Sequence, residues 1–405
     1  MLTQTRSLTF ERTLPAAPKE VFRAFTAASA LRDWLSNTAD IDPRKGGRIY
    51  LWWDTGYYSA GVITAISRDE SLSFTWRGPN DPESGEVSVA IAPHDTGAKV
   101  TVTHSGMGSG VEWAEAVDKI KSIWEDGLEN LESVLQTGVD LRFARRPMFG
   151  LSAADVLNDE IAARLGVPVK EGLVLTGLAD GMAAVKAGFQ KDDVLVEFGG
   201  AEIPNFQALG VALQAHRAGD KVPAVFYRGP EKHTLTMELG KRPETDIPET
   251  PEAVAKAARA LYEQYDAEIA ALFEGVSEAD ADYRPGSGDW SAKEVLGHLL
   301  AIERDTQVWI TTMLEDIDVL QVFHTNENAR IKALADCYAT VPVLLDELRR
   351  NEGITVAMIE AVPPDIASRK HLFRQIAQWL TGFDTHTKEH IAEMTKLIEA
   401  ARAQK

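Results

Sequence analysis

The sequence is poor in cysteine and in long apolar runs. Cys337 is the only cysteine among 405 residues, so an intramolecular disulfide is excluded. No apolar run approaches the roughly 18–20 residues of a membrane-spanning helix, and the N-terminal stretch "MLTQTRSLTFERTLPAAP" lacks the apolar core of a secretory signal. We therefore expect a cytoplasmic protein that does not enter a membrane.

Positive charge is also scarce. The formal net charge is -19 and the pI is about 5.0. Nucleic acid and anionic lipid bind basic surfaces, so neither is an expected partner. The rest of the composition is that of a globular protein, with 44% hydrophobic and 25% charged residues and a mean hydropathy of -0.17. At this length we expect a multidomain α+β chain.

Residues 1–140 combine many short strands with one long helix. "SLTFERTL" alternates apolar and polar positions, which predicts a strand, and "APKEVFRAF" has helical spacing with Pro18 in its first turn. Strand-like pieces separated by turn signals follow from 47 to 105. An apolar stripe from Val117 to Leu135 then predicts an amphipathic helix that ends at Gly138.

This order resembles the START-like helix-grip superfamily, in particular the branch with activators of the heat-shock chaperone ATPase. The resemblance is carried by "APKEVFRAFTAASALRDWL", "KGGRIYLW", "SAGVITAISRDESLSFTW" and "WEDGLENLESVL". It implies an antiparallel sheet wrapped round the long helix, with a cavity for a hydrophobic small molecule or a surface for a chaperone partner. The alternative is that Trp34, Trp53, Trp76 and Trp124 are simply core aromatics.

Residues 143–242 resemble the permuted PDZ domain of bacterial HtrA-type proteases, a small β-barrel with helices. The motifs are the aromatic-Gly-aliphatic segment Phe149, Gly150 and Leu151, the run "AAVKAGFQKDDVLVEFGG" and the turn "HRAGDKV". One departure is Asp192, where the family usually has glycine.

The PDZ resemblance implies a groove for a C-terminal peptide. Such a peptide adds a strand beside the aromatic-Gly-aliphatic segment, where Gly150 lets the backbones approach closely. The other wall would be the helix with Phe206, Leu209 and Leu213. The alternative is a domain used only for packing. No protease accompanies it, because the sequence has no G-x-S-x-G motif.

After the linker "KRPETDIPETPE" the strand signals stop, and residues 250–405 read as helices. Candidate helices are 251–274, 291–314, 326–350 and about 368–403, which predict a four-helix bundle. Ser291 and Glu294 have the spacing of a capping box at the start of the second helix.

Three histidines of this segment fall on inward-facing stripes. His386 and His390 are one helical turn apart, on a stripe with Phe383 and Leu397. Two neutral imidazoles buried without partners would cost about 1–3 kcal/mol each, so something must satisfy them. His298 lies on the stripe of another helix, and a bundle can bring the three together as a metal site with open positions.

With these residues the segment resembles the DinB-like metal-binding four-helix family. The motifs are "YRPGSGDWSAKEVLGHLLAIERD" and "FDTHTKEHIAEM". The resemblance implies one divalent transition metal, zinc or nickel, held by His298, His386 and His390, and pairing of bundles into a homodimer. The alternative is a degenerate site filled by water. Glu303, Glu389 and Asp384 are candidate acceptors for the ligand imidazoles, or else exposed carboxylates. His324 is expected in a solvated loop.

Two functions of different classes follow. The first is a metal-dependent enzyme, a thiol S-transferase or a hydrolase, with ligand- and peptide-binding accessory domains. Its ion activates a substrate thiol or water, and no residue is identified as its general base. The second is an adaptor without catalysis, with a C-terminal peptide in the PDZ-like groove and a hydrophobic ligand or chaperone partner at the helix-grip domain. The occurrence of these domains together does not choose between them.

Overall fold

A computed structural model describes residues 5–242, 246–286, 288–315, 328–382 and 384–404. The chain divides into two compact units, one made of residues 1–139 and 245–405 and the other of 140–244. The unit boundaries lie close to the boundaries expected for the PDZ-like segment. The expected helix-grip segment and the expected bundle belong to the first unit, so the division into three domains stays a prediction.

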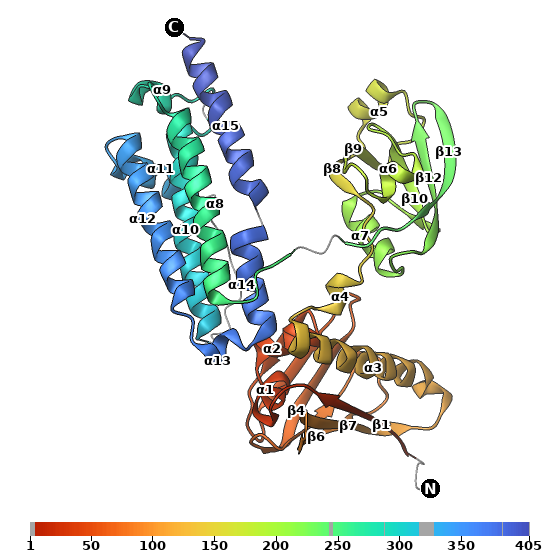
Figure 1. Cartoon of the computed structure of the whole chain (residues 1–405). Coiled ribbons are helices and arrows are strands. Elements are labelled where there is room, and N and C mark those ends of the chain that lie inside the picture. Colours follow the sequence, from red (N-terminus) through yellow and green to blue (C-terminus); the bar gives the residue numbers. More distant parts are fainter. Residues whose placement is uncertain (1–4, 243–245, 287, 316–327, 383, 405) are drawn as a thin grey trace. The chain divides into compact units, whose positions relative to one another are not determined.

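The N-terminal segment forms an antiparallel sheet of seven strands in the order β1-β7-β6-β5-β4-β3-β2 (Figure 1). Two short helices follow the first strand, and Pro18 opens the first of them as expected. The elements are β1 (Thr5–Leu14), α1 (Pro18–Thr26), α2 (Ala28–Trp34), β2 (Thr38–Ile41), β3 (Arg48–Trp52), β4 (Tyr58–Ser67), β5 (Ser71–Trp76), β6 (Gly85–His94), β7 (Gly97–Gly108), η1 (Val111–Trp113) and α3 (Ala114–Thr137).

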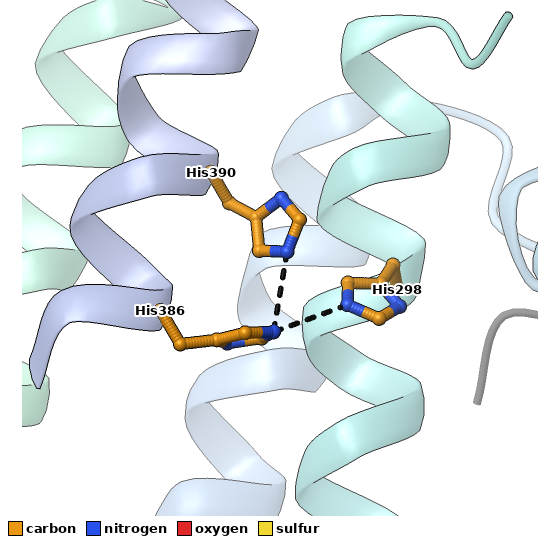
Figure 2. A group of neighbouring side chains, drawn as sticks. All are labelled: His298, His386 and His390. Carbon is orange, nitrogen blue, oxygen red and sulfur yellow. Dashed lines mark hydrogen bonds between the residues drawn. The ribbon is translucent and has the colours of Figure 1, made fainter. Parts of the chain in front are cut away.

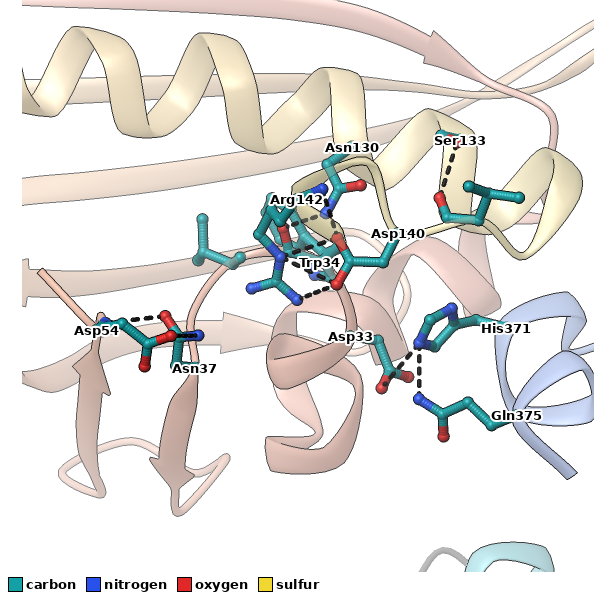
Figure 3. Close-up of polar contacts among 12 residues, drawn as sticks. Asp33, Trp34, Asn37, Asp54, Asn130, Ser133, Asp140, Arg142, His371 and Gln375 are labelled. Carbon is teal, nitrogen blue, oxygen red and sulfur yellow. Dashed lines mark hydrogen bonds and ion pairs between the residues drawn. The ribbon is translucent and has the colours of Figure 1, made fainter. Parts of the chain in front are cut away.

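The long helix α3 packs its apolar stripe on the sheet. It ends at Gly138, whose φ of 74° is left-handed and suits glycine. Buried Asn130 of α3 donates its side-chain N–H to the carbonyl of Trp34, 2.9 Å away (Figure 3). The packing alternative expected four core tryptophans: Trp34, Trp76 and Trp124 are fully buried in this core, whereas Trp53 is only partly buried against it.

The second unit is an antiparallel sheet in the order β13-β12-β10-β9-β8, with β11 paired to β10. Among the described residues of this unit, one isolated bridge between Met148 and Gly240 joins the two ends of the sheet, in place of the strand ladder that a closed barrel would have. The elements are α4 (Leu141–Ala144), β8 (Leu151–Val156), α5 (Asp159–Leu165), β9 (Leu173–Leu178), α6 (Ala183–Ala187), β10 (Val194–Phe198), β11 (Ala201–Glu202), α7 (Phe206–Gln214), β12 (Lys221–Arg228) and β13 (Glu231–Glu238).

The last segment is helical, with α8, α10, α12 and the pair α14 and α15 packed side by side (Figure 1). Ser291 and Glu294 form the expected capping box at the start of α10. The expected helix 326–350 is two helices, because α11 ends before Thr340 and Pro342 start a new helix. The elements are α8 (Pro251–Leu272), α9 (Glu278–Ala281), α10 (Ala292–Leu314), α11 (Asn328–Cys337), α12 (Val341–Glu360), α13 (Pro364–Ala367), α14 (Lys370–Gly382) and α15 (Asp384–Arg402).

Among the described residues, no helix has the length and apolar character that crossing a membrane requires.

Candidate metal centre

The packing of α10 against α15 brings the three predicted ligands together. The Nε2 atom of His386 lies 3.4 Å from Nε2 of His298 and 3.2 Å from Nε2 of His390. Figure 2 shows the three rings turned toward one another between the two helices. Within the part of the chain that the structure describes, this is the one group of three such side chains with the spacing of a metal site.

The separations between the nitrogens match those of a metal site. Zinc binds imidazole nitrogens at about 2.0–2.1 Å in a tetrahedral arrangement, which places two ligand nitrogens ~3.3 Å apart. The two separations of 3.4 and 3.2 Å bracket that value. One ligand nitrogen from each of the three side chains lies within 4.8 Å of the other two, which is close enough for the three to share one ion.

The surroundings of His386 favour its neutral form, which metal binding requires. His298 is only 2% exposed, and the indole ring of Trp290 lies against it with 5.1 Å between ring centroids. Burial lowers the pKa of His386, the charge of His390 lowers it further, and the carboxylate of Glu389 partly opposes this.

A carboxylate orients His390. Nδ1 of His390 lies 2.8 Å from Oε2 of Glu393, one turn along α15. A ring that donates its Nδ1–H to a carboxylate must present the lone pair of Nε2 on its other side, toward His386. Glu393 was not among the residues predicted from the sequence, although its position three residues after His390 was the available signal.

The three carboxylates predicted as acceptors have different outcomes. Glu303 is buried, but it accepts hydrogen bonds from the hydroxyls of Tyr262 and Thr355 and belongs to a separate network in the bundle. Glu389 is exposed on α15. The side chain of Asp384 lies outside the described residues, as do Phe383 and His324.

A buried acidic network was not anticipated either. Glu352 of α12 is 8% exposed, and its pKa is raised to about 9 by burial and by the charges of Asp266 and Glu303. The pKa of Glu303 is raised as well, mainly by burial. The sequence offered no sign of this network, because its members come from different helices and have no common spacing.

The predicted peptide site lies in the other unit. β8, which begins at Leu151, is the end strand of the sheet, and α7 lies against it. Phe149 is buried, and Gly150 has a φ of 96°. Of the residues expected on the helical wall, Phe206 is 63% exposed and Leu209 is 2% exposed in the core. Leu213 is partly buried.

The N-terminal segment matches a known family. Residues 15–136 match the family described as Activator of Hsp90 ATPase homolog 1-like protein, in agreement with the helix-grip domain expected there. Similar solved structures include a Mesorhizobium loti protein (25% identity, 32% of this chain, 96% of that chain, TM-score 0.29). Another is an HSP90 activator from Plasmodium falciparum (24% identity, 32% of this chain, 95% of that chain, TM-score 0.28).

A curated relative is named a probable periplasmic serine endoprotease DegP-like, from Marinomonas sp. (strain MWYL1). It is 30% identical over 98 residues, which are 24% of this chain and 21% of the relative. The chain thus spans about a fifth of that relative's length. The likeness is consistent with the expected HtrA-type PDZ domain. The relative's name places it in the periplasm, so the cytoplasmic location of this chain stays a prediction, as does the DinB-like family of the bundle.

Proposed function

We propose that the bundle holds one divalent transition-metal ion through the Nε2 atoms of His298, His386 and His390. The observation that carries this proposal is that Nε2 of His386 lies 3.4 Å from Nε2 of His298 and 3.2 Å from Nε2 of His390. Three protein ligands leave coordination positions for a ligand from solution, which is the arrangement of catalytic rather than structural sites. We infer that the chain is a metal-dependent protein that acts on a bound thiol or water.

The chain's own residues prepare the site for that chemistry. Burial keeps the pKa of His386 low, so its nitrogen is available at neutral pH. Glu393 holds the ring of His390 with Nε2 pointing inward. A bound divalent ion would lower the pKa of a coordinated thiol or water and make it a nucleophile. Cys337 is exposed on α11, so a reacting thiol would come from a substrate.

Metal content tests the proposal directly. Protein purified without chelators and without an affinity tag that binds metal is analysed for transition metals, then titrated with zinc and nickel. We expect about one ion per chain in the wild type and in the exposed-histidine control His94→Ala, and less than about a tenth of that in His386→Ala. A wild-type protein that binds neither metal would contradict the proposal.

Activity separates the enzyme from the adaptor. Loaded wild-type protein and His386→Ala are assayed for transfer of a low-molecular-weight thiol to an electrophile and for ester hydrolysis. The enzyme proposal expects turnover that requires His386. Metal binding with no turnover in either assay would favour the adaptor.

The PDZ-like unit supports a second candidate function, recognition of C-terminal peptides. The supporting observation is that β8 is the end strand of its sheet, with α7 alongside, so an extended peptide could pair with its outer edge. A bulky residue at Gly150 is a poor test, because even a Cβ there would lie 2.5 Å from the Cβ of Met182.

A matched pair on α7 gives a better test of peptide binding. Phe206 is 63% exposed and Val211 is 61% exposed, and they lie on different sides of the same helix. We expect a library of C-terminal peptides to contain ligands that Phe206→Glu weakens at least tenfold, whereas Val211→Glu binds them as the wild type does. Equal loss in both variants would argue against a groove at Phe206.

The N-terminal domain is proposed to bind a chaperone or another protein partner. The support is the matched family's description as an activator of Hsp90 ATPase. A hydrophobic small molecule inside the domain is the less favoured ligand, since Trp34, Trp76 and Trp124 pack between α3 and the sheet. Two measurements test this: whether an Hsp90-type chaperone co-purifies with residues 1–405, and whether the chain stimulates the ATPase activity of that chaperone. The expected homodimer stays a separate prediction.

A further inference from the structure

The indole ring of Trp290 lies against the ring of His298, one of the three proposed metal ligands. The ring centroids are 5.1 Å apart and the ring planes are tilted by 37°. This separation is within the range of about 4.5–7 Å over which aromatic rings attract one another. Because His298 is only 2% exposed, the indole is part of what encloses its imidazole.

The contact restrains the torsion of His298 that a helix leaves soft. On a helix χ1 is confined to a few staggered positions, whereas χ2 of histidine is broad. An indole against one face of the imidazole restricts χ2, and χ2 decides where Nε2 points. Nε2 of His298 is turned toward Nε2 of His386, 3.4 Å away (Figure 2). The orientation that the metal site requires is therefore the one that the indole favours.

Trp290 is itself held at two points. Its Nε1–H donates to Oδ1 of Asn328, the first residue of α11, at 2.9 Å. The next residue of the chain, Ser291, is the N-cap of α10; its N–H donates to Oε2 of Glu294 at 2.9 Å, and its Oγ accepts the N–H of Glu294 at 3.2 Å. Arg284 in turn donates to Glu294, with 2.8 Å between Nε and Oε2. Hydrogen bonds thus fix both the indole and the backbone that carries it.

We propose that Trp290 is a positioning residue of the metal centre: its indole, tied to Asn328, sets the ring orientation of His298. This inference rests on the proposed metal site and adds a second kind of support to it. The ring of His390 is oriented by the carboxylate of Glu393 at 2.8 Å, whereas that of His298 is oriented by an aromatic face. Partners that orient ligand side chains typically account for about 10- to 100-fold in metal affinity.

Zinc affinity of the full chain tests the proposal, measured by competition with a chelating indicator at fixed pH and salt. Trp290→Ala should bind zinc at least about tenfold more weakly than the wild type. Trp290→Phe keeps a flat ring against His298 and should stay within about threefold of the wild type. The matched control is Trp309→Ala, which removes an indole from α10 about three turns beyond His298, where it packs on Trp379. This control should bind zinc as the wild type does.

An NMR comparison of the metal-free proteins gives a readout that does not need zinc. An aromatic ring displaces the resonances of atoms over its face. The Cε1–Hε1 signal of His298, assigned from its loss in His298→Ala, should therefore move in Trp290→Ala and stay in place in Trp309→Ala.

A second variant keeps the test decisive if Trp290→Ala does not fold. Asn328 is exposed, so Asn328→Ala should leave folding intact while it releases the indole N–H. We expect it to move the same His298 signal and to weaken zinc binding about threefold.

The outcomes separate this proposal from the one it rests on. If the wild type binds no zinc, the metal site itself fails, and the NMR comparison still decides whether the indole orients His298. The positioning role is overturned if Trp290→Ala leaves the His298 signal in place, or if it binds zinc as tightly as the wild type. It is also overturned if Trp290→Phe or Trp309→Ala loses as much affinity as Trp290→Ala.

Discussion

Removing the carboxylate of Glu393 should weaken metal binding without removing a ligand. Oε2 of Glu393 lies 2.8 Å from Nδ1 of His390, and the side chain is 44% exposed. Loss of such a partner typically costs 10- to 100-fold in metal affinity. Because water can reach this carboxylate and replace part of the hydrogen bond, we expect Glu393→Ala to bind about tenfold more weakly, equivalent to about 1.4 kcal/mol.

The conservative variant sharpens this prediction. Glu393→Gln keeps an oxygen that can accept Nδ1–H but loses the charge. Hydrogen bonds to charged groups are roughly twice as strong as neutral ones, so about half of the free energy, and hence about threefold in affinity, should be lost. If the substitutions acted only by loosening α15, metal affinity would not fall in the order wild type, Glu393→Gln, Glu393→Ala.

Affinity is measured by competition between apo protein and a chelating indicator for zinc and for nickel, at fixed pH and salt. Glu399→Ala is the matched control, because Glu399 is exposed on the same helix. It lies about two and a half turns beyond His390 and so is remote from the centre. The reasoning is refuted if Glu393→Ala binds metal as tightly as the wild type, or if Glu399→Ala loses as much affinity.

Three further predictions concern stability. Burial lowers the pKa of His104 to about 4, so the fold should lose stability as pH falls from about 6.5 toward 4. Urea unfolding followed by tryptophan fluorescence should show a loss of about 2 kcal/mol in the free energy of unfolding between pH 7 and 5, and a smaller loss in His104→Gln. The pKa of Glu352 is raised to about 9, so the bundle should lose stability as pH rises from about 4.5 through 9. In thermal melts, Glu352→Gln should reduce the fall of the melting temperature with pH, and an unchanged pH dependence in this variant would contradict the prediction. Asp192 has a left-handed φ of 71°, which glycine adopts more readily than other residues. In urea-dependent proteolysis, Asp192→Gly should be neutral or stabilising by up to about 1 kcal/mol and Asp192→Val should be destabilising; the reverse order would show that the backbone at this position is not strained.

Local patterns accounted for many of the elements. The capping box at Ser291 and Glu294, Pro18 at the start of α1 and Gly138 after α3 are signals that depend on neighbouring residues, and each lies where it was expected. One boundary that was wrong, between α11 and α12, is also local. It was missed because continuous apolar spacing outweighed the turn at Thr340 and Pro342.

The candidate site depended on a different kind of information. Helical spacing alone placed His386 and His390 on one side of a helix, and it put His298 on an inward stripe of another. It could not give their separation, because contact between α10 and α15 depends on the packing of side chains remote in sequence. The convergence of the three Nε2 atoms is a property of that packing.

The sequence by itself determined which residue types were available and on which side of each helix they lie, since these follow from a period of about 3.6 residues. Only the tertiary structure decided which of them meet. It joined His298 to His386 and gave the role of acceptor to Glu393 rather than Glu303. The physical reason is that burial and distance arise from helices packed together, and both set the pKa and the hydrogen bonding of a side chain.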